Sequence, residues 1–263
     1  MQGLRELDRV LRGDAGRGGT PVSLGPLLAA NVVLAALYGV CMGVYGVSGR
    51  DVPEYRQMLA DAVKVPLLFV LTVLVTFPSL YVFSALVGSR LTAIDLARLL
   101  TAALAVLLAV LAAFGPIVGF FSVTTSSYPF VVLLNVAVFA LAGVFGLSYF
   151  TRTLDAMLPK PPPPPRRARP VRPEEPSDAT VPVAEVAELP VAPVAADPAP
   201  PDPAAVRVVV RVWLVAFALV GAQMSWVLRP FVGSPQLDFT WFRPRQSSFF
   251  EAVLKSLRML LNP

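Results

Sequence analysis

Long apolar runs separated by short polar stretches dominate the chain. A helix needs roughly 20 residues to cross the hydrocarbon core of a bilayer. Five runs reach about that length, and they cover residues 22–47, 65–88, 96–121, 129–150 and 206–228. The pattern therefore predicts an all-α fold, a polytopic membrane helical bundle of five spans.

The composition changes completely between the fourth and fifth runs. Residues 158–205 hold more than half of the chain's 27 prolines. Such a segment cannot build a packed core, which predicts a disordered, Pro-rich tether. The chain then divides into a basic cytosolic N-terminus (1–21), a four-span block (22–157), the tether (158–205), the fifth span (206–228) and an interfacial tail (229–263).

The overall composition agrees with a membrane protein and narrows the chemistry. Hydrophobic residues make up 56% and charged residues 15% of the chain, whereas soluble domains carry about 25% charge. The net charge of +5 comes from basic residues beside the apolar runs, which favours anionic lipid headgroups over nucleic acid as a partner. Without histidine, and with Cys41 as the one cysteine, internal disulfides and the usual zinc sites are excluded. No cofactor is expected, and we interpret Cys41 as a packing residue.

Orientation follows from the distribution of lysine and arginine between the loops. With the N-terminus and the tether inside, most of the 22 basic residues lie on the inner side. The sequence therefore predicts an outer C-terminus, in a bacterial cytoplasmic (inner) membrane, although the tail itself is basic.

Two amphipathic helices are predicted on the outer surface. In residues 50–64, Asp51 and Glu54 have capping-box spacing. One face of that helix is apolar and the opposite face is polar. The apolar face holds Tyr55, Met58, Leu59, Ala62 and Val63, and the polar face holds Glu54, Gln57, Asp61 and Lys64. The second helix begins with a capping box of Ser248 and Glu251 and presents an apolar arc through Leu261.

The end of the fifth run, GAQMSWVLRPFVGSP (221–235), has two interpretations. In the first, Trp226 and Arg229 anchor the helix at the membrane interface, Pro230 ends it, and the chain then follows the headgroups. In the second, Gln223, Ser225 and Arg229 face a water-filled cavity formed with the first four spans. Gln223 and Arg229 lie six residues apart and do not share one helical face, which favours the first.

Pro78 lies in the middle of the second run and should kink its helix. Thr76 and Ser79 could satisfy the backbone groups that it frees. Discontinuous helices mark some transport sites, so Pro78 is a further candidate residue.

Small residues predict close helix packing in three runs. The pairs and rows are Gly39 with Gly43, Gly115 with Gly119, and Ala137 with Ala140 and Gly143. The hydroxyl-rich turn SVTTSSYP (122–129) is expected to satisfy the backbone of a tight helical hairpin.

Charge inside the predicted spans is almost absent. Thr92, Asp95 and Arg98 mark a capped start of the third span, and Asn31 and Asn135 are the deepest amides. Neither a paired carboxylate nor a serine with a base is evident, so the sequence predicts no enzyme and no catalytic or metal-binding residues.

The stretch KVPLLFVLTVLVTFPSLYVFSALVGSRLT (64–92) resembles bacterial members of the Yip1-like membrane proteins, and the resemblance extends over residues 20–150. It implies a non-enzymatic, membrane-organising or adaptor role and no particular site residues. We therefore expect a non-catalytic integral membrane scaffold that recruits an unidentified protein partner through its tether or outer helices. The alternative is a small-solute channel or transporter subunit, and a homo-oligomer is left open.

Overall fold

Seven helices make up the secondary structure of the part that this computed structural model describes, which is residues 2–13, 22–48, 55–86, 91–157, 203–229, 231–232, 239–242 and 248–261. They are α1 (Gln2–Leu11), α2 (Leu24–Ser48), α3 (Tyr55–Leu86), α4 (Ala93–Thr124), α5 (Tyr128–Met157), α6 (Pro203–Val227) and α7 (Phe249–Leu261). Five of them, α2 to α6, are long and apolar enough to cross a membrane. The predicted all-α, five-span class is confirmed at this level.

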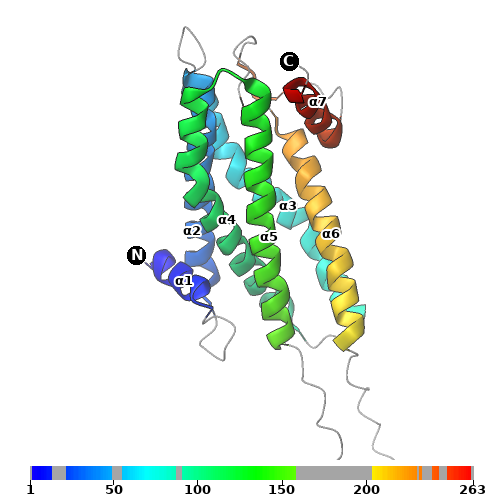
Figure 1. The fold of residues 1–263 in the computed structure, drawn as a ribbon. Helices are drawn as coiled ribbons and strands as arrows, with labels where there is room; N and C mark the ends of the chain where they lie inside the picture. The colour runs from blue at the N-terminus through cyan, green and yellow to red at the C-terminus, as the bar shows by residue number, and fades with distance from the viewer. Residues whose placement is uncertain are drawn as a thin grey trace, which may run out of the picture.

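The five long helices run up and down side by side (Figure 1). The last turn of α5 and the first turn of α6 lie at one end of the bundle, which we call the tether end. The turn between α4 and α5 lies at the opposite end, together with α7, and we call this the tail end. The predicted tether lies outside the described residues up to position 202, and α6 begins at Pro203.

The packing order differs from the chain order. Helix α2 packs on both α3 and α4, and α4 packs on α5. The fifth span, α6, packs chiefly on α3 and only slightly on α5. The last span is therefore attached to the four-helix block mainly through a single helix.

The N-terminal segment, for which the sequence indicated only basic character, contains a short helix that packs on the bundle. Leu7 and Val10 of α1 are buried in an apolar cluster with Leu27 of α2 and Ala102 of α4. Leu7 and Val10 lie three residues apart and therefore share one face of α1. This apolar face covers the tether end of α2.

Two of the three small-residue rows form close contacts, and the third does not. A Cβ built on Gly43 would lie 2.6 Å from the Cα of Met58, and one on Gly115 would lie 3.1 Å from the Sγ of Cys41. A Cβ on Gly143 would meet nothing within 4 Å, and Ala137 and Ala140 are exposed. The row on α5 therefore makes no close contact within the described part of the chain, where α5 turns Ala142 and Gly146 toward α4.

Candidate functional site

Helix α3 joins two elements that the sequence analysis had separated. The predicted surface helix, of which residues 50–54 lie outside the described residues, continues without a break into the second span. The 32-residue helix passes through Pro66 and Pro78. Because the helix does not end at residue 64, its first turns cannot lie along a membrane surface independently of the span.

The polar face of this first part is enclosed by the protein, and its apolar face is exposed. Gln57, Asp61 and Lys64 are 3%, 0% and 1% exposed, whereas Tyr55, Leu59 and Val63 are 57–62% exposed. A membrane supplies the physical reason. Lipid solvates apolar side chains, so polar side chains gain more from the protein interior than from an outer face. The two faces of the predicted amphipathic helix are therefore present, but the helix forms the first part of the second span and is not a separate element.

A single polar stripe follows the buried side of α3 along its whole length. Its members recur every three or four residues, and six of the eight are polar. They are Gln57, Asp61, Lys64, Leu68, Thr72, Thr76, Leu80 and Ser84. This stripe is the candidate site, because it places an ionisable pair and several hydroxyls inside an otherwise apolar bundle.

The tail-end part of the stripe is a cluster of three charged or amide side chains. The Nε2 of Gln57 donates a hydrogen bond to Oδ1 of Asp61 over 2.9 Å. The Oδ2 of Asp61 is buried and accepts no hydrogen bond from the described part of the chain. Lys64, one turn further on, supplies the opposite charge. We call Gln57, Asp61 and Lys64 the polar cluster.

Two glycines of α2 make room for this cluster. The backbone carbonyl of Asp61 lies against Gly39, and its Oδ2 would lie 3.1 Å from a Cβ built on Gly43. Any larger residue at either position would push α2 away from the carboxylate. The small residues that were predicted to serve packing therefore also enclose the buried charge.

The segment after α6 covers the polar cluster. Gln57 donates a long hydrogen bond, 3.4 Å, to the carbonyl oxygen of Phe231, and the Nζ of Lys64 lies 5.6 Å from the ring centroid of Phe242. Val232 and Leu228 are buried, and Val232 belongs to the same apolar cluster as Tyr38 and Tyr45 of α2. The chain therefore folds back over the bundle at residues 231–232. The predicted path along the headgroups there did not include these contacts with the bundle.

The predicted candidates at the end of α6 do not converge on one site. Gln223 is exposed, and Ser225 donates its hydroxyl proton to the carbonyl of Ala222 within the same helix. Arg229 stacks its guanidinium 4.1 Å from the ring centroid of Trp226, and both side chains are half-buried. This cation–π contact keeps Arg229 beside its own helix.

The tether-end part of the stripe is satisfied differently from the polar cluster. Thr72, Thr76 and Ser84 each donate to a carbonyl oxygen three or four residues back in α3. These bonds need no other helix. Hydroxyl groups of this kind are common where membrane helices pack closely.

Pro78 is exposed, so it lines no interior site in the described part of the chain, but the residues around it hold α6. The hydroxyl of Ser79 donates to the carbonyl of Thr76 over 2.7 Å and not to the carbonyl of Leu74, the group that Pro78 leaves without its helical donor. The indole Nε1 of Trp213, on α6, lies 3.1 Å from both this carbonyl oxygen and the Ser79 hydroxyl. Trp213 is also stacked between Phe150 and Phe217.

An ion pair joins α5 and α6 at the tether end. The Nε of Arg207 lies 2.8 Å from Oδ1 of Asp155, and both side chains are about half exposed. The two helices from which residues 158–202 depart therefore meet in space.

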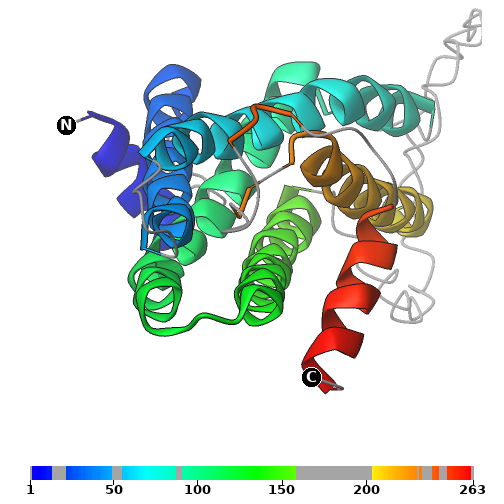
Figure 2. The ribbon, with the colours of Figure 1, turned by 90° about the horizontal axis from the view of Figure 1, so that it is seen from above.

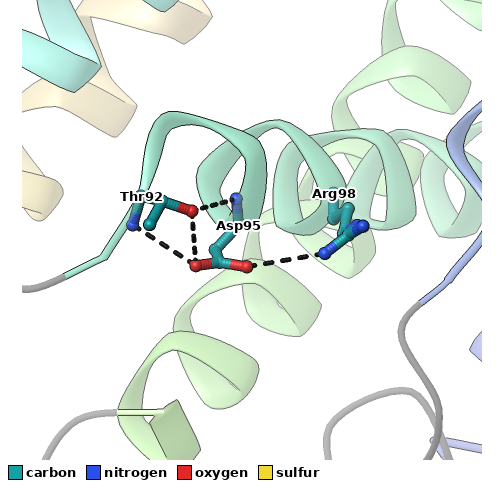
Figure 3. A network of polar contacts seen from close by, with 3 residues as sticks. All are labelled: Thr92, Asp95 and Arg98. Atoms are coloured by element: carbon teal, nitrogen blue, oxygen red, sulfur yellow. Dashed lines mark hydrogen bonds and ion pairs between the residues drawn. The ribbon is translucent and has the colours of Figure 1, made fainter.

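The polar residues predicted elsewhere in the bundle have structural partners. Thr92 and Asp95 form a reciprocal capping box at the start of α4, and Arg98 lies 3.7 Å from Asp95 (Figure 3). The amide of Asn31 donates to the carbonyl of Thr101, and Tyr38 donates to the side-chain oxygen of Asn135. In the turn that follows α4, the N–H of Ser127 donates to the hydroxyl of Thr125, as expected for hydroxyls that satisfy a hairpin backbone.

A small cavity lies between α4, α5 and α6 in the half of the bundle near the tether end. Its volume is about 20 Å³, room for roughly one water molecule. The ten residues that line it are apolar, and neither Gln223 nor Arg229 is among them. This cavity offers no polar groups for a solute. Among the described residues, no group of three His, Cys, Asp or Glu side chains is placed to hold a metal ion.

The polar cluster was missed because the charges were assigned to a surface helix. The spacing of Gln57, Asp61 and Lys64 is in phase with Leu68, Thr72 and Thr76 of the next run. Reading the two segments as one helix would have placed all six on one face. The sequence has no break between them, since a proline at position 66 can be accommodated within a membrane helix.

Comparison of the chain with protein-family models, with curated proteins and with solved structures found no match. The function must therefore be inferred from the residues and their arrangement.

Proposed function

We propose that the protein is a non-catalytic integral membrane scaffold or adaptor, which recruits a protein partner through the Pro-rich segment at its tether end. The observation that carries this proposal is the ion pair between Asp155 and Arg207, 2.8 Å apart. Since α5 and α6 already meet there, a short loop would connect them, as in most helical bundles.

The segment between these helices is far longer than the connection requires. Residues 158–202 would reach on the order of 140 Å if extended as polyproline, at roughly 3.1 Å per residue. Its first half is basic and its second half is acidic. A partner-binding role accounts for both the surplus length and the charge pattern, and it agrees with the adaptor role implied by the Yip1-like resemblance.

The experiment is a deletion of residues 162–200, which leaves about six residues to join α5 and α6, a usual length for such a loop. We expect unchanged membrane insertion and thermal stability, together with loss of the proteins that co-purify with the full chain from native membranes. A variant in which a Gly/Ser segment of equal length replaces residues 162–200 is the matched control, because it keeps the length of the connection and removes its sequence. If the deletion unfolds the protein, or if the same proteins still co-purify, the proposal is wrong.

The polar cluster favours a second candidate function, a small-solute transporter. A fully buried carboxylate with one unpaired oxygen, inside a chain of this hydropathy, is a typical feature of coupling sites in transporters. The apolar lining of the cavity between α4, α5 and α6 weighs against it. The discriminating measurement is solute or proton flux in proteoliposomes, comparing the native chain with Asp61→Asn. Flux that depends on Asp61 would favour the transporter over the scaffold.

A further inference from the structure

Helix α7 lies across the long helices at the tail end, beside α5 and α6 (Figure 2). It begins after Ser248, whose hydroxyl accepts a hydrogen bond from the backbone N–H of Glu251. Each of its side chains is at least partly exposed. Its half-buried positions are Phe249, Ala252, Val253 and Ser256, which identifies them as the side that faces the bundle.

A second face of α7 is apolar and exposed. Phe250, Leu254, Leu257 and Leu261 follow one another at helical spacing and are 42–71% exposed. At about 100° per residue, their centre lies roughly a third of a turn from the side that contacts the bundle. This stripe therefore points away from the side that packs on the bundle, and its residues belong to none of the apolar clusters in the described part of the chain.

A third face of α7 is polar. Glu251, Lys255 and Arg258 lie beyond the apolar stripe, on the side away from the bundle. The nearby Trp241 and Phe242 are 53% and 59% exposed, and aromatic side chains of this kind are enriched at membrane interfaces. The helix thus has three sides, which suit protein, hydrocarbon and headgroups in turn.

We propose that α7 is a lipid-docking surface at the tail end. Phe250, Leu254, Leu257 and Leu261 enter the hydrocarbon, while Lys255 and Arg258 contact lipid phosphates. Burial of the stripe by about 5–10 Å below the headgroups is usual for a helix lying in the interface. Lipid is the favoured occupant because α7 packs beside helices that are long and apolar enough to cross a membrane. The sides of such a bundle are surrounded by lipid.

Single cysteines in a Cys41→Ser background test the placement. Leu254→Cys and Leu257→Cys report the stripe, and Glu251→Cys and Lys255→Cys are the matched controls one residue or one turn away. Each variant of the full chain is labelled with a fluorescent reagent and reconstituted in phosphatidylcholine vesicles. Quenching is then measured with acyl chains brominated at shallow positions and with aqueous iodide. All four positions are exposed, so labelling leaves the packing of the bundle intact.

We expect brominated lipid to quench the two stripe positions at least about twofold more strongly than the two controls, and iodide to show the opposite order. Equal quenching at all four positions would overturn the proposal. Protection of the stripe from both quenchers, rising with the protein-to-lipid ratio, would show that a second copy covers it and would also overturn the proposal.

A separate experiment tests the contact of Lys255 and Arg258 with lipid phosphates. Adding phosphatidylglycerol to the vesicles should deepen the stripe positions in the native background, and the double variant Lys255→Gln, Arg258→Gln should remove that response. If phosphatidylglycerol does not change the depth of the stripe positions in either background, Lys255 and Arg258 do not contact lipid phosphates.

Discussion

The two halves of α3 use the same buried face in opposite ways. Near the tail end, Gln57 and Lys64 contact groups that are distant in the sequence, which are the carbonyl of Phe231 and the ring of Phe242. Near the tether end, Thr72, Thr76 and Ser84 bond to carbonyls of α3 itself. Polar side chains of the first kind tie the helix to one tertiary arrangement, whereas those of the second kind are satisfied wherever the helix packs.

This contrast also explains how the fifth span is held. The segment that covers the polar cluster begins at Leu228, at the end of α6. The middle of α6 is held by the indole N–H of Trp213, which donates to α3. Apart from these points and the ion pair between Arg207 and Asp155, the contacts of α6 with the described part of the chain are mainly apolar, and hydrocarbon could replace them at little cost. The polar contacts therefore determine where α6 docks.

The largest effect is expected where backbone meets backbone. Gly39→Ala should destabilise the protein by about 3 kcal/mol or more, because the added Cβ would collide with the main chain at Asp61 and Ala62. Gly143→Ala is the matched control, since a Cβ there meets nothing within 4 Å. Thermal unfolding in detergent measures both, and similar melting temperatures would show that the α2–α3 approach is less close than described.

Removal of the buried carboxylate should come next. Asp61→Ala leaves the Gln57 amide and the Lys64 charge without their partner, which should cost about 3 kcal/mol. Asp61→Asn preserves an acceptor for Gln57 and should cost less. The same unfolding measurement distinguishes them. If Asp61→Ala is no worse than Asp61→Asn, the carboxylate contributes little to holding α3 in place.

The indole donor should have a smaller effect. Trp213→Phe keeps an aromatic ring between Phe150 and Phe217 but loses the hydrogen bonding to α3, a loss of about 1 kcal/mol. We expect a lower melting temperature and increased protease cleavage within α6. Trp241→Phe, at an exposed position, is the control and should be near-neutral.

The smallest effect is predicted for a hydroxyl that bonds its own helix. Thr72→Val preserves shape and removes one bond to the carbonyl of Leu68, so the change should stay below about 1 kcal/mol. A loss as large as that of Asp61→Ala would show that the two halves of α3 do not differ as proposed.

Much of the architecture was predictable because the hydropathy of a single segment indicates whether it can cross a membrane. All five apolar runs correspond to helices, and the capping box of Thr92 and Asp95 was recognised from spacing alone. The candidate residues at the end of α6 were less well predicted. Gln223 is exposed, and Arg229 stacks on Trp226, so neither contributes to the polar stripe.

The sequence by itself determined where helices form, since apolar length and periodicity act on a single segment at a time. Only the tertiary structure decided which face of each helix is inside. The polar side of residues 55–64 could have faced water, had α3 begun at residue 65. Because the helix is continuous, and because Gly39 and Gly43 let α2 approach Asp61, the polar side is enclosed instead. Contacts between helices that are distant in the sequence determine which face is buried, and no local sequence pattern specifies these contacts.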